Sequence, residues 1–261
     1  PTPIQKDYLP QHFLVDVAEV EDVNLVGSVH IQADGALADP VSETSWLSKL
    51  SKSGIPSAIV GFVDLTREDA EAVLKNHLSF DEFRGVRQII GLLEQRPDLS
   101  FTKEHLLRNR SWQENFALLD KHNLCFDLQL YPEQMKEAAE FLGGFPKVPI
   151  VIDHAGSPYD QTESGLKLWS EGLSALANLP NIHIKLSGFG MYESDWSSES
   201  FLVLFQTILE LFGANRIMWG SNFPVDSLMK SYRFCVTQML NWISPLSPEE
   251  QGLIAAETAI K

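Results

Sequence analysis

The sequence predicts an α/β protein with the architecture of a (β/α)8 TIM barrel. Its 261 residues match the usual size of such a barrel as one domain. Short, almost continuous apolar runs alternate with stretches of helical periodicity, which is typical of parallel strands buried on both faces. Polar residues follow several of the apolar runs, and a barrel gathers its site from many strand ends.

The candidate strands are seven apolar runs, at residues 25–33, 57–65, 83–90, 124–131, 148–156, 181–189 and 216–224. An open doubly wound sheet is the alternative architecture. It would need a phosphate-binding glycine loop, and the nearest segment, at residues 188–190, lacks a third glycine and a helix start. The polar residues at the strand ends favour the barrel: Gln32, Asp64, Arg87, Gln129, His154, Ser187 and Asn222.

Helical patterns fill the segments between these runs. One opens at Asp39-Pro40 and ends at Gly54, and a second begins with Thr66 as N-cap and Asp69 as the acid of the first turn. Further helices are predicted at residues 102–123, 132–142, 165–179, 198–212, 228–243 and 248–260. The chain has no internal repeat, low-complexity tract or linker, which favours a single domain over residues 1–261.

The composition argues against nucleic acids and membrane surfaces as partners, and we expect the substrate to be a small molecule. The chain has 20 Lys and Arg against 35 Asp and Glu, a net charge of −15, which repels nucleic acids and anionic membrane surfaces. Hydrophobic residues make up 44% of the chain, but no apolar run has the length of a membrane span. Cys125 and Cys235 show no C-x-x-C spacing, as expected for reduced thiols in a cytoplasmic protein.

A series of motifs in one order resembles the amidohydrolase-2 family of TIM-barrel hydrolases, which includes sugar lactonases and pyrone dicarboxylate lactonases. The resemblance covers the chain from Tyr8 onward. It is carried by Val63-Asp64-Leu65, Phe83-Arg84-Gly85-Val86-Arg87-Gln88, Phe126-Asp127-Leu128, Val151-Ile152-Asp153-His154-Ala155-Gly156, Ile184-Lys185-Leu186-Ser187-Gly188 and Met218-Trp219-Gly220-Ser221-Asn222-Phe223-Pro224-Val225-Asp226.

The chain departs from the family pattern at two places. Members of the family open with a strand that ends in His-x-His, and this chain begins with a segment that resembles the family sequence just after that strand. We therefore expect the first strand of the barrel to be missing from the chain as given, which explains a count of seven. The second departure is Asn222, where many relatives carry Asp.

The resemblance places His154 in the barrel mouth, where it polarises a substrate carbonyl or binds a metal; the alternative is a histidine of the core. Arg87 shares a strand face with Gly85 and Ile89, and an inward arginine needs an anion. That anion is either a substrate carboxylate or a structural partner such as Asp127. We predict that the substrate contacts are Arg87, Gln32, Asp127 and Gln129, with an internal hydrogen-bond network as the alternative for the last two.

Asn222 and Asp226 are the candidates that handle the attacking water. An amide cannot accept a proton from water, so Asn222 can only orient it. Asp226, four residues later, is the nearest carboxylate, although it is also suited to cap a helix that starts at residue 227. The general base is therefore predicted at Asp226, with the helix cap as its alternative.

Metal ligands are scarce in this sequence. Zinc needs three or four converging His, Cys or carboxylate ligands, and only His154 stands at a family ligand position. His30 and His183 are predicted to be packing residues. We expect no tightly bound metal in the chain as given, and allow for a single zinc ion in a longer form.

These features together predict a hydrolase of the amidohydrolase superfamily that opens a lactone-type ester of a small carboxylated or sugar-derived molecule. Two alternatives remain. One is a decarboxylase of the same superfamily. The other is a catalytically impaired barrel that binds small molecules without turnover, which the absent histidines and Asn222 would explain.

Overall fold

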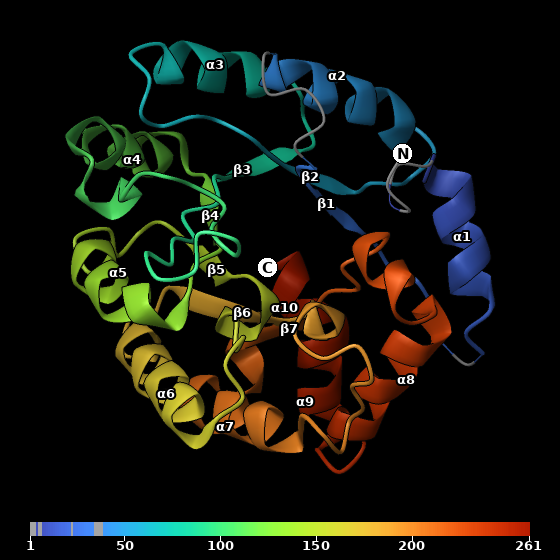
Figure 1. Cartoon of the computed structure of the whole chain (residues 1–261). Coiled ribbons are helices and arrows are strands. Elements are labelled where there is room, and N and C mark those ends of the chain that lie inside the picture. Colours follow the sequence, from blue (N-terminus) through green and yellow to red (C-terminus); the bar gives the residue numbers. More distant parts are fainter. Residues whose placement is uncertain (1–3, 5–6, 22, 34–38) are drawn as a thin grey trace. The chain divides into compact units, whose positions relative to one another are not determined.

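The computed structural model describes residues 4, 7–21, 23–33 and 39–261 (Figure 1). The described chain divides into two compact units. Unit 1 takes its residues from Pro1–Val26, Ile152–Ala177 and His183–Lys261, and unit 2 from Gly27–Val151 and Asn178–Ile182. The single domain over residues 1–261 stays a prediction.

All seven predicted strands are confirmed, and each is shorter than its apolar run. They are β1 (Val29–Ile31), β2 (Ala58–Gly61), β3 (Phe83–Arg87), β4 (Cys125–Leu128), β5 (Ile150–Ile152), β6 (Ile182–Leu186) and β7 (Ile217–Trp219). The strands follow one another in the order of the chain. The pairs β1–β2, β2–β3 and β3–β4 of unit 2 and β6–β7 are parallel, as predicted for an α/β protein.

The helices of unit 2 are α2 (Pro40–Ser51), α3 (Ala70–His77), α4 (Arg110–His122) and α5 (Met135–Leu142), with 3-10 turns at Leu106–Arg108 and Pro132–Gln134. Two predicted starts are wrong. Helix α3 begins one residue after Asp69, and the Thr66 hydroxyl donates to Asp64 Oδ1 at 2.7 Å instead of capping a helix. Helix α4 begins late because Asn109 Oδ1 accepts the backbone N–H of Trp112, at 3.0 Å.

The helices of unit 1 are α1 (Pro10–Ala18), α6 (Glu163–Ala177), α7 (Leu202–Phe212), α8 (Tyr232–Ile243), α9 (Pro248–Gly252) and α10 (Thr258–Ile260), with a π-helical segment at Leu253–Glu257. Helix α1 was not predicted, and it lies beside α8 (Figure 1). Helix α8 starts at Tyr232 and not at residue 228, because the Ser231 side chain accepts the backbone N–H of Phe234 at 3.1 Å. No helix within the described ranges is long and apolar enough to span a membrane.

Each unit packs an aromatic cluster behind its strands. In unit 2, the ring centroids of Trp112 and Phe116 lie 5.1 Å apart, and Phe126 of β4 packs against both. In unit 1, the ring of Phe189 lies 4.9 Å from that of Trp242 of α8. Because burial of aromatic rings is a large part of core energetics, these clusters hold the strand ends, and the polar residues beyond them, in place.

Candidate active site

His154 follows β5 in a turn of unusual backbone conformation. The φ angles of His154, Ala155, Gly156 and Ser157 are all positive, at 52°, 53°, 71° and 53°. For residues other than glycine this conformation costs about 1 kcal/mol or more each, so the surroundings must hold the turn. Trp169 of α6 contributes, because its indole Nε1 donates to the carbonyl of Ala155 at 2.7 Å. Strained backbone of this kind is concentrated at functional sites.

The imidazole ring of His154 is held by the end of β6. Its Nδ1 lies 3.1 Å from the hydroxyl oxygen of Ser187, in a buried hydrogen bond. Gly188 comes next, with φ of +69°, and a Cβ added there would lie 2.6 Å from the same nitrogen. Asp153, the residue just before His154, has a buried carboxylate that accepts a hydrogen bond from the Lys185 ammonium at 2.8 Å. The histidine is thus fixed in orientation and nearly buried, with 7% of its surface exposed.

Asn222 and Asp226 form a hydrogen-bonded pair after β7. Asn222 Nδ2 donates to Asp226 Oδ1 at 2.8 Å, and it also lies 3.5 Å from the sulfur of Met191. Asp226 is only 3% exposed. Burial raises the pKa of the Asp226 carboxyl to about 6, although the hydrogen bond from Asn222 acts in the opposite direction. A carboxylate with a pKa near neutrality is suited to take up and release a proton.

The alternative role of Asp226 as a helix cap is wrong. Asp226 lies in a 3-10 turn, Val225–Leu228, and helix α8 begins only at Tyr232, where Ser231 is the cap. Asp226 and Ser187 both line one small cavity in unit 1, which brings Asp226 into the neighbourhood of the residue that is hydrogen-bonded to His154.

The four predicted substrate contacts lie in unit 2. Arg87 Nη2 donates to the backbone carbonyl of Gln32, and Arg87 is opposite Asp127 in the β3–β4 register. Gln32, Asp127 and Gln129 are buried. Glu43 lies within electrostatic reach of Arg87. Burial raises the pKa of Glu43, but hydrogen bonds from His30 and Ala33 and the charge of Arg87 bring it below its usual value.

The structure thus brings His154 together with Ser187 and Asn222 with Asp226 in unit 1, and Arg87 with Gln32 in unit 2. The catalytic and substrate-binding roles assigned to the predicted site residues stay predictions. No pattern in the sequence indicated the contact of Met191 with Asn222, because the two residues are far apart along the chain and thioethers occur in every core.

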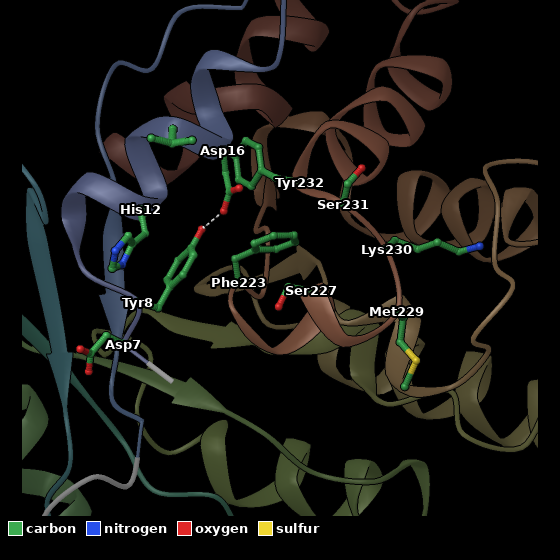
Figure 2. A pocket seen from close by; sticks show the side chains of 11 residues that line it. Asp7, Tyr8, His12, Asp16, Phe223, Ser227, Met229, Lys230, Ser231 and Tyr232 are labelled. Atoms are coloured by element: carbon green, nitrogen blue, oxygen red, sulfur yellow. Dashed lines mark hydrogen bonds between the residues drawn. The ribbon is translucent and has the colours of Figure 1, made fainter. Parts of the chain in front are cut away.

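A pocket of about 630 Å³ in unit 1 was also missed from the sequence (Figure 2). It lies between α1 and the segment that leads from Asn222 into α8. The ring of Phe223 lies next to those of Tyr8 and Tyr232, and the Tyr8 hydroxyl donates to Asp16 Oδ2 at 2.5 Å. Burial, followed by the bond to Asp16, raises the pKa of Tyr8. Burial and then the charge of Asp16 raise the pKa of Tyr232 to about 12.

Metal ligation is not supported by the described residues. Among them, no three His, Cys, Asp or Glu side chains come together in a group that could hold a metal ion. Nδ1 of His154 is hydrogen-bonded to the hydroxyl of Ser187, and Nε2 of His30 is hydrogen-bonded to Glu43 Oε1 at 3.0 Å. A zinc site with three protein ligands therefore does not fit this set of residues.

Several sequence relatives match most of the chain, and two of them are at least 30% identical to it over the matched residues. The uncharacterized protein y4mH of Sinorhizobium fredii is 35% identical over 232 residues, which are 88% of this chain and 77% of that protein. The L-fucono-1,5-lactonase of Burkholderia ambifaria is 30% identical over 233 residues, which are 86% of this chain and 73% of that enzyme.

Solved structures confirm the predicted fold. The crystal structure of an amidohydrolase from Burkholderia multivorans with bound zinc has a TM-score of 0.80 to this chain at 24% identity, covering 97% of this chain and 87% of the other.

The model of the amidohydrolase family matches residues 8–261, nearly the whole sequence. The chain therefore belongs to the amidohydrolase family, and it is a hydrolase.

Proposed function

We propose that this hydrolase opens the ring of a lactone derived from a small sugar or a small carboxylated molecule. The observation that carries the proposal is the pair of Asn222 and Asp226, in which a buried carboxyl has a pKa of about 6. The sequence relationship to an L-fucono-1,5-lactonase supports the choice of a lactone as substrate.

The reaction needs a hydrogen-bond donor that polarises the lactone carbonyl and a general base that takes a proton from the attacking water. His154 donates a ring N–H to the lactone carbonyl oxygen and stabilises the charge that develops there. Asn222 orients the attacking water, and Asp226 accepts its proton as the water oxygen bonds to the carbonyl carbon. When the ring C–O bond breaks, protonated Asp226 returns that proton to the leaving oxygen, so that a hydroxy acid is released.

The pocket of Figure 2 supports a polyhydroxylated substrate more than an anionic one. It borders the segment of Asn222 and Asp226, since Phe223 and Ser227 line it. Asp16 places a carboxylate there, which accepts hydrogen bonds from hydroxyl groups and repels anions. Aromatic rings such as that of Phe223 present flat apolar surfaces to the C–H face of a sugar.

Arg87 remains our candidate for binding an anionic substituent, should the substrate carry one. The arginine has Glu43 as an electrostatic neighbour, which supports the alternative of internal charge compensation. A cytoplasmic location, inferred from the reduced thiols of Cys125 and Cys235, likewise remains a proposal.

The proposal is tested by a panel of sugar lactones and carboxylated lactones, with ring opening followed as acid release. We expect turnover of at least one sugar lactone by the parent and about a hundredfold less by the Asp226→Ala variant. Carbon dioxide among the products would instead identify a decarboxylase. Thermal stabilisation by a lactone without any ring opening would indicate a binding protein.

A further inference from the structure

Two consecutive residues at the end of β6, Ser187 and Gly188, contact the imidazole of His154. The hydroxyl of Ser187 lies 3.1 Å from Nδ1, and both side chains are more than nine-tenths buried. A neutral histidine carries one ring proton, and the hydrogen bond made by one nitrogen decides whether the other nitrogen holds it. Ser187 is therefore placed to select the tautomer of His154.

We propose that Ser187 is a positioning residue that donates its Oγ–H to Nδ1 and so keeps the proton of His154 on Nε2. This inference rests on the proposed function, in which His154 polarises a carbonyl. Only a ring N–H can do so, and the Nε2–H tautomer supplies it when Nδ1 acts as an acceptor. The opposite direction, Nδ1–H donating to the hydroxyl, leaves an acceptor at Nε2, which would repel the carbonyl oxygen.

The imidazole of His154 can occupy its position only because Gly188 has no side chain. A Cβ at this residue would lie 2.6 Å from Nδ1 and 2.8 Å from Cγ of His154, closer than real Cβ contacts allow. The positive φ of Gly188 adds strain to any such substitution. The Gly188→Ala variant thus keeps the hydroxyl of Ser187 but displaces the imidazole of His154. It therefore distinguishes the effect of the ring position on activity from the effect of the tautomer.

The kinetic test compares Ser187→Ala with a matched control. Removing the donor should lower kcat about tenfold and leave KM within about twofold, because the hydroxyl acts through His154 and not on the substrate. Ser187→Cys retains a weak donor of similar size and should recover part of the loss. The control is Ser198→Ala, a buried hydroxyl that accepts from Asn241 at 3.4 Å, and it should leave kcat unchanged.

A spectroscopic readout separates this inference from the proposed function. With ¹⁵N-labelled histidine, and with His154→Gln to assign the signal, the parent without substrate should show His154 as the Nε2–H tautomer. Ser187→Ala should populate both tautomers, while Ser198→Ala should match the parent. These results would support the role of Ser187 even if no lactone were turned over.

Two results would overturn the inference. One is a proton on Nδ1 of His154 in the parent. The other is a Ser187→Ala variant that retains both the parental tautomer and the parental kcat. If Ser187→Ala fails to fold, Ser187→Cys carries the same test, because its weak donor should give a mixed tautomer population.

Discussion

Replacing Asn222 by Asp tests whether Asp226 is the general base. In the parent, the amide of Asn222 donates to Asp226 Oδ1 at 2.8 Å. The Asn222→Asp variant removes that donor and places a second carboxyl at the same distance. If residue 222 had simply lost a catalytic carboxylate, the substitution would restore a base and raise activity about a hundredfold. We expect the opposite, because we propose that Asp226 already serves as the base.

The magnitude follows from the distance and the burial of the pair. Two charges about 4 Å apart, at an effective dielectric constant of about 20, repel each other by about 4 kcal/mol, which corresponds to about three pKa units. The pKa of Asp226 is already raised to about 6 by burial. The two carboxyls should therefore share one proton well above neutral pH, with an apparent pKa that belongs to the pair.

The assay is a pH–rate profile of parent and variant on the same lactone. The variant should show lower activity at pH 7 and a pH optimum that is displaced upward.

The stability of the variant gives a second readout. A carboxyl whose pKa is higher in the folded than in the unfolded state stabilises the fold at low pH, and this contribution is lost as the pH rises through the folded pKa. The variant should therefore lose stability relative to the parent between about pH 6 and pH 9. A large gain of activity at pH 7, together with a harmless Asp226→Ala substitution in the parent, would refute the assignment.

Three further substitutions test neighbouring parts of the site. His154→Ala should lower kcat about a hundredfold or more while the urea midpoint changes little; a large loss of stability with activity retained would make His154 a core residue. Lys185→Met leaves the carboxylate of Asp153 buried without its cation, so urea unfolding should show a loss of about 3–5 kcal/mol, and adding Asp153→Asn should recover most of it. Asp226→Asn removes a carboxyl of raised pKa, so its unfolding free energy should vary less than that of the parent between about pH 4 and pH 7; an equal pH dependence would mean that Asp226 does not titrate there.

The sequence predicted the strands well, because buried parallel strands leave a simple signature. Each of the seven apolar runs contains one strand, and all the strands except β3, which ends on Arg87, stop short of the polar residue at the end of the run. In the run at residues 148–156, β5 ends at Ile152 and the positive φ angles begin at His154. A hydrophobic pattern records only which residues are apolar and contains no information on backbone angles. A strand predicted from it therefore extends into the turn that carries His154.

Helix starts were less predictable, because several side chains compete to cap the same helix. Thr66, Asp69 and Asn109 are all good capping residues, and only the tertiary structure decides which backbone N–H each one meets. The same uncertainty applied to Asp226. Asp226 directly precedes the helix start predicted at residue 227 and so was suited to cap it, but Ser231 is the cap, five residues later.

The assignment of Ser231 as the cap changes what the Asp226 carboxyl is available to do. A capping carboxylate accepts backbone N–H donors, which stabilise its charged form and depress its pKa. Asp226 instead accepts the amide of Asn222, and burial outweighs that bond, so its pKa rises to about 6. Natural selection for stability alone would favour an apolar residue at a position that is only 3% exposed. A carboxyl kept there at a cost in stability, next to an amide that cannot itself act as a base, is the arrangement expected of a proton acceptor.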